Sequence, residues 1–98
     1  MKNLIVENLE YNGRKVHNQF VIWYEENGKT VKIYQSYKSI ILKWENGVLI
    51  EIGNNCDYSR TTGKYRNYVT VTTKKEFEKM LQNEFTYNKE TQTYIRNN

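Results

Sequence analysis

The sequence contains one histidine and one cysteine, His17 and Cys56, the side chains that most often carry nucleophilic catalysis. A cysteine nucleophile needs a base that accepts its proton and a further group that orients the base. His17 stands in the middle of a predicted strand and Cys56 in an asparagine-rich turn. A strand histidine at a sheet surface and a small packing cysteine are the simpler interpretation. We therefore expect a protein that is not an enzyme.

Metal and cofactor sites are not predicted either. Apart from His17 and Cys56, the only paired acidic residues beside a turn are Glu25 and Glu26, and together these residues form no four-ligand set. A phosphate-binding loop needs several glycines before a helix, and Gly63 stands alone. A single cysteine also excludes an internal disulfide.

The region 58–66 alternates aromatic rings with cations, a pattern typical of surfaces that bind single-stranded nucleic acid. Arginine guanidinium groups suit bidentate recognition of phosphate or carboxylate. In the alternative interpretation, the tyrosines are core-facing anchors of a short helix and the cations form an ordinary solvated face. The predicted partner-binding residues are Arg60, Lys64, Tyr65, Arg66 and Tyr68.

The formal net charge of +4 lies entirely in the second part of the chain. Residues 1–58 carry seven Lys and Arg against seven Asp and Glu, whereas residues 59–98 carry eight against four. Such asymmetry is typical of a face for an anionic partner, and equally of a solvated basic surface that has no partner. It also disfavours mimicry of DNA, because a cationic protein is repelled from a channel lined by Lys and Arg.

The elements that must position these residues begin with a predicted antiparallel meander. Asn-Gly pairs at 12–13, 27–28 and 46–47 are strong hairpin signals, because both turn positions need positive φ. In the last strand the face with Val48, Ile50 and Ile52 is expected to be buried. The five predicted strands cover 4–9, 16–24, 31–34, 40–44 and 48–52, and residues 20–24 are apolar on both faces.

Helices and a small hairpin are predicted after the meander. Thr61 or Thr62 is expected to cap a short helix, and Thr73 with Glu76 forms a capping box for a helix over 73–84. Phe77, Met80 and Leu81, with Phe85 beyond them, should form the buried face of that helix. Residues 85–87 and 93–95 predict a terminal hairpin. The expected fold is a single α+β domain over 1–98.

The composition suits a globular protein, which we expect in the cytoplasm of a host bacterium. Only 38 % of residues are apolar, but fourteen large aromatic side chains compensate. No run of eighteen apolar residues and no signal peptide is present, so we expect neither a membrane span nor secretion. The thirteen asparagines and eleven lysines, with no alanine or proline, are typical of AT-rich coding sequence. The source is expected to be a low-GC bacterium or its phage.

Residues 34–41, 47–49 and 56–62 together carry a family resemblance. The chain resembles small, mostly uncharacterised proteins of phages and mobile elements in low-GC bacteria. Their pattern is an "SY-x-T-x-I" strand, a glycine turn and a "W-D-Y-S-x-T-T-x-x-H" corner. Ser39, Cys56 and Tyr65 stand where Thr, Trp and His are usual, and the resemblance covers about residues 34–70.

Related domains are similar to parts of some anti-CRISPR proteins that act on type II RNA-guided nucleases. The resemblance therefore implies a phage-encoded anti-CRISPR that inhibits a Cas nuclease, with its guide RNA, by direct stoichiometric binding. The alternative is a small nucleic-acid-binding accessory protein of a phage. The corner itself also has a structural interpretation, in which Asp57 with Thr61 or Thr62 bonds backbone amides. The oligomeric state remains open.

Overall fold

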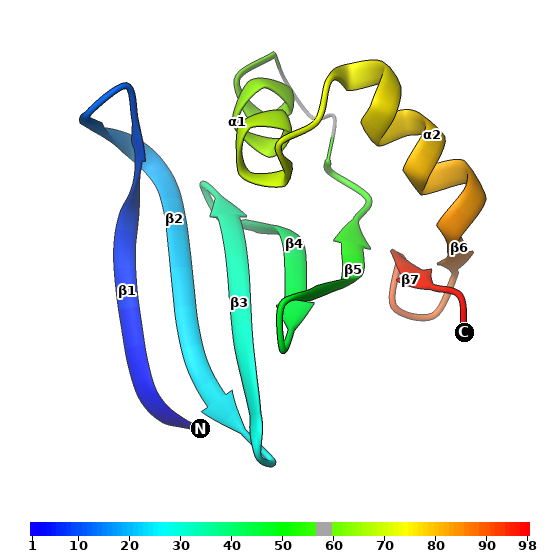
Figure 1. Cartoon of the computed structure of the whole chain (residues 1–98), viewed down its shortest axis with the longest axis horizontal. Helices are drawn as coiled ribbons and strands as arrows, with labels where there is room; N and C mark the ends of the chain where they lie inside the picture. The colour runs from blue at the N-terminus through cyan, green and yellow to red at the C-terminus, as the bar shows by residue number, and fades with distance from the viewer. Residues whose placement is uncertain (57–59) are drawn as a thin grey trace.

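The computed structural model describes residues 1–56 and 60–98 (Figure 1). Strands occupy most of the first half, and both helices lie in the second half. In chain order the elements are β1 (Lys2–Tyr11), β2 (Arg14–Glu26), β3 (Lys29–Ser36), β4 (Ser39–Glu45), β5 (Val48–Gly53), α1 (Arg60–Thr70), α2 (Lys74–Glu84), β6 (Phe85–Asn88) and β7 (Thr93–Arg96).

One antiparallel sheet of seven strands contains all the described strands, in the order β1-β2-β3-β4-β5-β7-β6. The predicted α+β class is confirmed, but the sheet has more strands than the five expected. The predicted terminal hairpin is confirmed as β6 and β7, and it belongs to the same sheet because β7 pairs with β5. In Figure 1 both helices lie beyond the upper ends of β3, β4 and β5. Within the described residues, neither helix is long and apolar enough to span a bilayer.

The three predicted Asn-Gly turns are confirmed. In each pair both residues have positive φ, for example 53° at Asn12 and 76° at Gly13, as a type I′ turn requires. A further turn falls where the resemblance suggested a continuous strand. Tyr37 has φ of 53° and lies between Ser36 and Ser39, which pair with each other, so this stretch is a hairpin end.

The buried face of β5 differs from the predicted one. Leu49 is 8 % exposed whereas Val48 is 51 % exposed, although Ile52 is fully buried as expected. The reason is a β-bulge: Trp44 pairs with Leu49 but Lys43 pairs with Glu51, so β5 contains an extra residue. An extra residue reverses the alternation of side chains between the two faces of the sheet.

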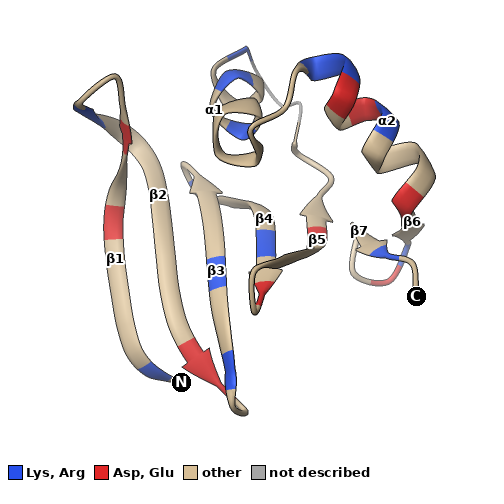
Figure 2. Cartoon of the chain, viewed as in Figure 1, with Lys and Arg blue, Asp and Glu red and all other residues tan. Residues whose placement is uncertain are grey.

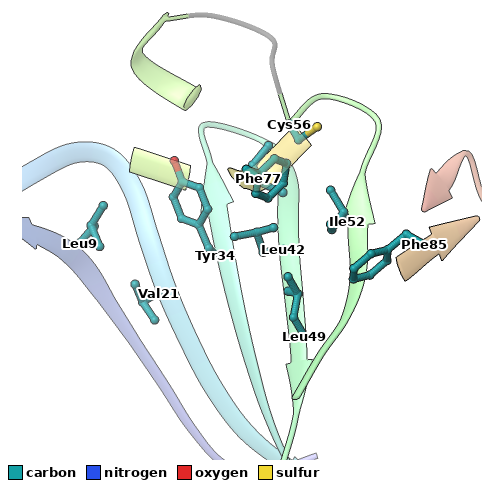
Figure 3. Packing of buried hydrophobic residues seen from close by; sticks show 10 residues of the cluster. Leu9, Val21, Tyr34, Leu42, Leu49, Ile52, Cys56, Phe77 and Phe85 are labelled. Carbon is teal, nitrogen blue, oxygen red and sulfur yellow. The ribbon is translucent and has the colours of Figure 1, made fainter. Parts of the chain in front are cut away.

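The hydrophobic core lies between the sheet and the helices (Figure 3). The predicted capping box is confirmed: Thr73 accepts from the Glu76 amide, and the Glu76 carboxylate accepts from the Thr73 amide. Phe77 is buried as expected, whereas Met80 and Leu81 are only partly buried. Phe85 does not continue the helical face, because the chain turns extended there and this residue begins β6.

A buried chain of polar side chains joins α1 to the sheet. The Tyr34 hydroxyl donates to Gln19 Oε1, Gln19 Nε2 donates to Ser36 Oγ at 3.0 Å, and that hydroxyl bonds Thr62 Oγ1 at 3.1 Å. Thr61 and Thr62 lie inside the first turn of α1 and not before it, so the predicted cap position is wrong. The predicted role of Asp57 lies outside the described residues.

Burial also raises the pKa of Tyr34 to about 12, because the phenolate would lose its water. A raised pKa adds stability below pH 10, and this contribution is lost as the pH rises from 10 to 12. At neutral pH, Tyr34→Phe should cost about 1–3 kcal/mol, since the Gln19 acceptor loses its donor. At pH 11 the difference in the free energy of unfolding between the two proteins should shrink by about 1.4 kcal/mol. Only the wild type then loses the stability that comes from the raised pKa of Tyr34.

Urea unfolding of both proteins at pH 7, 9 and 11 measures the change, and ionisation of the other tyrosines and the lysines cancels in the difference between the proteins. A constant difference across this range would contradict a raised pKa at Tyr34.

Candidate partner-binding surface

All five predicted partner-binding residues lie on helix α1, but they do not all lie on the same face of it. Arg60, Lys64 and Tyr68 are spaced by four residues, so they lie along one face of the helix. All three are exposed. Tyr65 is partly buried at the edge of this face and packs against the core cluster. The structure thus brings four of the five predicted residues to one side of α1.

Arg66 is the exception, and the prediction that it contacts a partner is corrected. Its side chain is completely buried on the opposite face of α1. Nη1 donates to the Cys56 carbonyl at 3.0 Å, and Nε and Nη2 donate to Asn67 Oδ1 at 3.2 and 2.8 Å. The guanidinium carbon lies 4.0 Å from the centre of the Phe77 ring. Arg66 therefore belongs to the interior that holds α1 against α2.

Tyr11 of β1 joins the surface although the sequence analysis did not identify it. Its ring meets the rings of Tyr65 and Tyr68 edge to face, with centroids 5.4 and 4.8 Å apart. The Lys64 ammonium lies 4.6 Å from the centre of Tyr11 and 5.2 Å from that of Tyr65. We call Tyr11, Lys64, Tyr65 and Tyr68 the tyrosine–lysine cluster. No local signal near Tyr11 indicates this role, because the sheet brings it to α1 from more than fifty residues away.

Val71 extends the exposed face of α1 beyond its last turn. Its amide bonds the Tyr68 carbonyl at 3.2 Å and the Thr72 amide bonds the Asn67 carbonyl at 3.0 Å, which is a Schellman motif. The motif places Val71 at φ of 55°, where glycine is usual and a β-branched residue is strained. Its side chain is 90 % exposed, so burial does not compensate for the strain.

The exposed face of α1 is also positively charged. Helix α1 contains three cations and no acidic residue. Figure 2 shows further cations at the β1–β2 hairpin, where Arg14 pairs with Tyr11 of the cluster. Below Tyr68 and Val71 a groove has Glu7 and Glu10 of β1 in its wall. Among the described residues, the exposed face of α1 is therefore basic and aromatic, and Glu7 and Glu10 lie at its border with the sheet.

The residues that carry the family resemblance meet at a second hollow, of about 660 Å³. Ser36 and Ser39, at the β3–β4 turn, line it together with Thr61 and Thr62 of α1. The buried bond between Ser36 and Thr62 ties these two stretches together. This contact gives both stretches a structural role.

The two candidate nucleophilic groups occupy different environments. His17 is exposed on β2, and Cys56 is buried in the core cluster with 5 % exposure. Within residues 1–56 and 60–98, no three His, Cys, Asp or Glu side chains gather as a metal site would require.

Comparison with known proteins found no matching family model, curated protein or solved structure. The resemblance to small phage proteins therefore stays a prediction.

Proposed function

We propose that this protein is a non-enzymatic binding protein that contacts its partner directly through the exposed face of α1. The observation that carries the proposal is Val71, an apolar residue held in a strained conformation with 90 % exposure. Strain of this kind persists where function needs it. Val71 continues the row formed by Arg60, Lys64 and Tyr68, and arginine and tyrosine are enriched among energetically important interface residues.

For the partner, the proposal follows the family resemblance. The protein would be a phage-encoded anti-CRISPR acting in the cytoplasm of the host bacterium, and its target a type II Cas nuclease with its guide RNA. The basic face supports contact with an acidic protein patch or with the bound RNA, since electrostatic complementarity speeds and orients association. The same charge argues against occupation of the DNA channel by mimicry.

A second candidate function is nucleic-acid binding without a protein target. Tyr68 is 47 % exposed and packs edge to face against Tyr11, over whose ring the Lys64 ammonium lies. Its ring offers a surface on which an unpaired base can stack. This alternative predicts recovery of the protein with RNA or DNA, and loss of that recovery after nuclease treatment. A nuclease-resistant complex favours the protein target.

The binding test uses a purified type II Cas nuclease loaded with guide RNA, with association and DNA cleavage as readouts. Val71→Gly should raise the free energy of unfolding by about 1 kcal/mol, because glycine adopts positive φ without strain. The same substitution should weaken binding, since it removes the exposed side chain. A variant that is more stable than the wild type but binds its partner more weakly identifies Val71 as a contact residue. A residue needed only for the fold would not show this combination.

Charge reversal provides the matched pair of variants. Lys64→Glu should weaken association about tenfold, whereas Lys79→Glu, an equal charge change at an exposed position of α2, should have little effect. If Val71→Gly and Lys64→Glu both bind and inhibit like the wild type, the face of α1 is not the contact surface. If the wild type fails to bind the loaded nuclease, the proposed target is wrong.

A further inference from the structure

Strand β1 forms one edge of the sheet and is the first long element of the chain (Figure 1). One side of β1 pairs with β2, and in the described structure no strand pairs with its other side. An edge strand presents unpaired amide and carbonyl groups to another chain, and proteins usually blunt such edges with charges. Leu4, Ile5 and Val6 are instead uncharged and 57 %, 50 % and 57 % exposed.

The opposite edge of the sheet differs in both length and composition. Strand β6 has only four residues, Phe85–Asn88, and its first residue is buried. Short edge strands offer few groups for pairing. The free side of β1 is therefore the edge on which a further strand would find a long apolar surface.

The register with β2 defines which residues of β1 share a face. Ile5 and Glu7 lie opposite Trp23 and Val21, so they share one face, and Val6 lies on the other. Lys2 lies opposite Glu25 and so shares the face of Ile5, although the two residues are three positions apart in the chain. The extra residue is accommodated at Asn3, which has φ of 54°.

We propose that β1 pairs antiparallel with β1 of a second copy of this chain, across a two-fold axis that passes beside Ile5. A two-fold axis perpendicular to the sheet requires opposing residues to point to the same face. With Ile5 opposite its own copy, Leu4 and Val6 face each other on one side of the joined sheet. On the other side, the bulge at Asn3 brings Lys2 opposite Glu7 of the second copy.

This register is complementary in both charge and polarity. It forms two Lys2–Glu7 pairs per dimer and places apolar side chains against each other between them. Moving the axis to Val6 would instead oppose Ile5 to the Glu7 carboxylate, and moving it to Glu7 would oppose two carboxylates. Like charges opposed across a strand pair are destabilising, so the register centred on Ile5 is the most favourable of these three.

The proposed dimer also has a consequence for the surface on α1, although it does not depend on that surface. A perpendicular two-fold axis keeps the same face of both sheets on the same side. Both copies of the exposed α1 face would then lie on one side of a continuous sheet. A partner with two matching sites would be bound bivalently, which raises the overall affinity without new contacts.

Cysteine trapping tests the register. In an antiparallel pair, opposing Cα atoms lie about 4.5–5.5 Å apart, within the range that a disulfide bridges. Ile5→Cys should therefore form a covalent dimer on mild oxidation. Glu10→Cys is the control on the same strand, since its two copies would be about 34 Å apart at a rise of ~3.4 Å per residue. The wild-type chain controls for Cys56.

Charge exchange tests the same register without oxidation. Lys2→Glu should raise the dimer dissociation constant about tenfold, because it places a carboxylate opposite the Glu7 carboxylate at two positions of the dimer. Glu7→Lys should do the same, and Lys2→Glu combined with Glu7→Lys should restore wild-type dimerisation. Light scattering after size-exclusion chromatography gives the mass, and circular dichroism checks the fold of each variant.

Two results would overturn the proposal. One is a wild-type chain that stays monomeric over the full concentration range, and the other is a dimer that Ile5→Cys does not trap or that the double charge exchange does not restore. The state of the α1 surface does not affect these readouts, so failure of the proposed function leaves them interpretable.

Discussion

Arg66→Ala is expected to lower the free energy of unfolding by about 3–5 kcal/mol, one of the two largest losses of any single substitution considered. The fully buried guanidinium donates to the Cys56 carbonyl and to the Asn67 side chain, and it stacks on the Phe77 ring. Alanine removes these contacts together and leaves a cavity between the helices. Chemical denaturation monitored by circular dichroism measures the loss.

Two further variants separate the causes of that loss. Arg66→Lys keeps the charge but not the planar fork of donors, so it should also be strongly destabilising. Arg60→Ala is the control in the same helix, and it should stay within about 0.5 kcal/mol of the wild type because its side chain is exposed. An Arg66→Ala protein as stable as the wild type would show that the guanidinium is not held in the interior.

Phe77→Ala should likewise cost about 3–5 kcal/mol, the range for removing a buried phenylalanine ring. Phe77 is 1 % exposed and lies in the centre of the core cluster, over the sheet (Figure 3). The ring also packs against the Arg66 guanidinium, 4.0 Å from the ring centre. Its loss therefore removes apolar burial and exposes a charged group to a cavity.

Leu81→Ala provides the comparison within α2. From the sequence, a loss of about 2–5 kcal/mol is expected if Leu81 is buried. The structure leaves this side chain only partly buried, so its truncation should cost clearly less than that of Phe77. Equal losses for the two variants would contradict the packing of α2. Arg66 and Phe77 are in contact, so the effects of truncating both should not add.

These expectations change how a loss of binding must be interpreted. From the sequence, Arg66 is a candidate contact residue like Arg60, and its substitution by alanine would be expected to weaken binding alone. With Arg66 in the interior, weaker binding by an Arg66 variant reports damage to the fold that presents α1. Lys64→Glu and Val71→Gly, both at exposed positions, report on contact itself.

Local patterns in the sequence determined several elements of this protein. Each Asn-Gly pair forms its turn because the conformations it favours are properties of two adjacent residues. The Thr73 capping box begins α2 for a similar reason, since its hydrogen bonds join residues three apart. The antiparallel order of the first five strands follows from the short turns between them. The terminal hairpin was also predictable, because its strands are separated by only a few polar residues.

Other features depend on residues far apart in the chain, and only the tertiary structure decided them. The bulge in β5 arises from its pairing with β4, and it reverses the face on which Leu49 lies. Helix α1 carries aromatic and basic residues all around, so periodicity alone cannot say which arginine is buried. The sheet, the segment at Cys56 and Phe77 of α2 together enclose Arg66 and leave Arg60 exposed. Tyr11 reaches the cluster for the same reason: the meander places β1 beside α1, and no interaction between sequence neighbours specifies that contact.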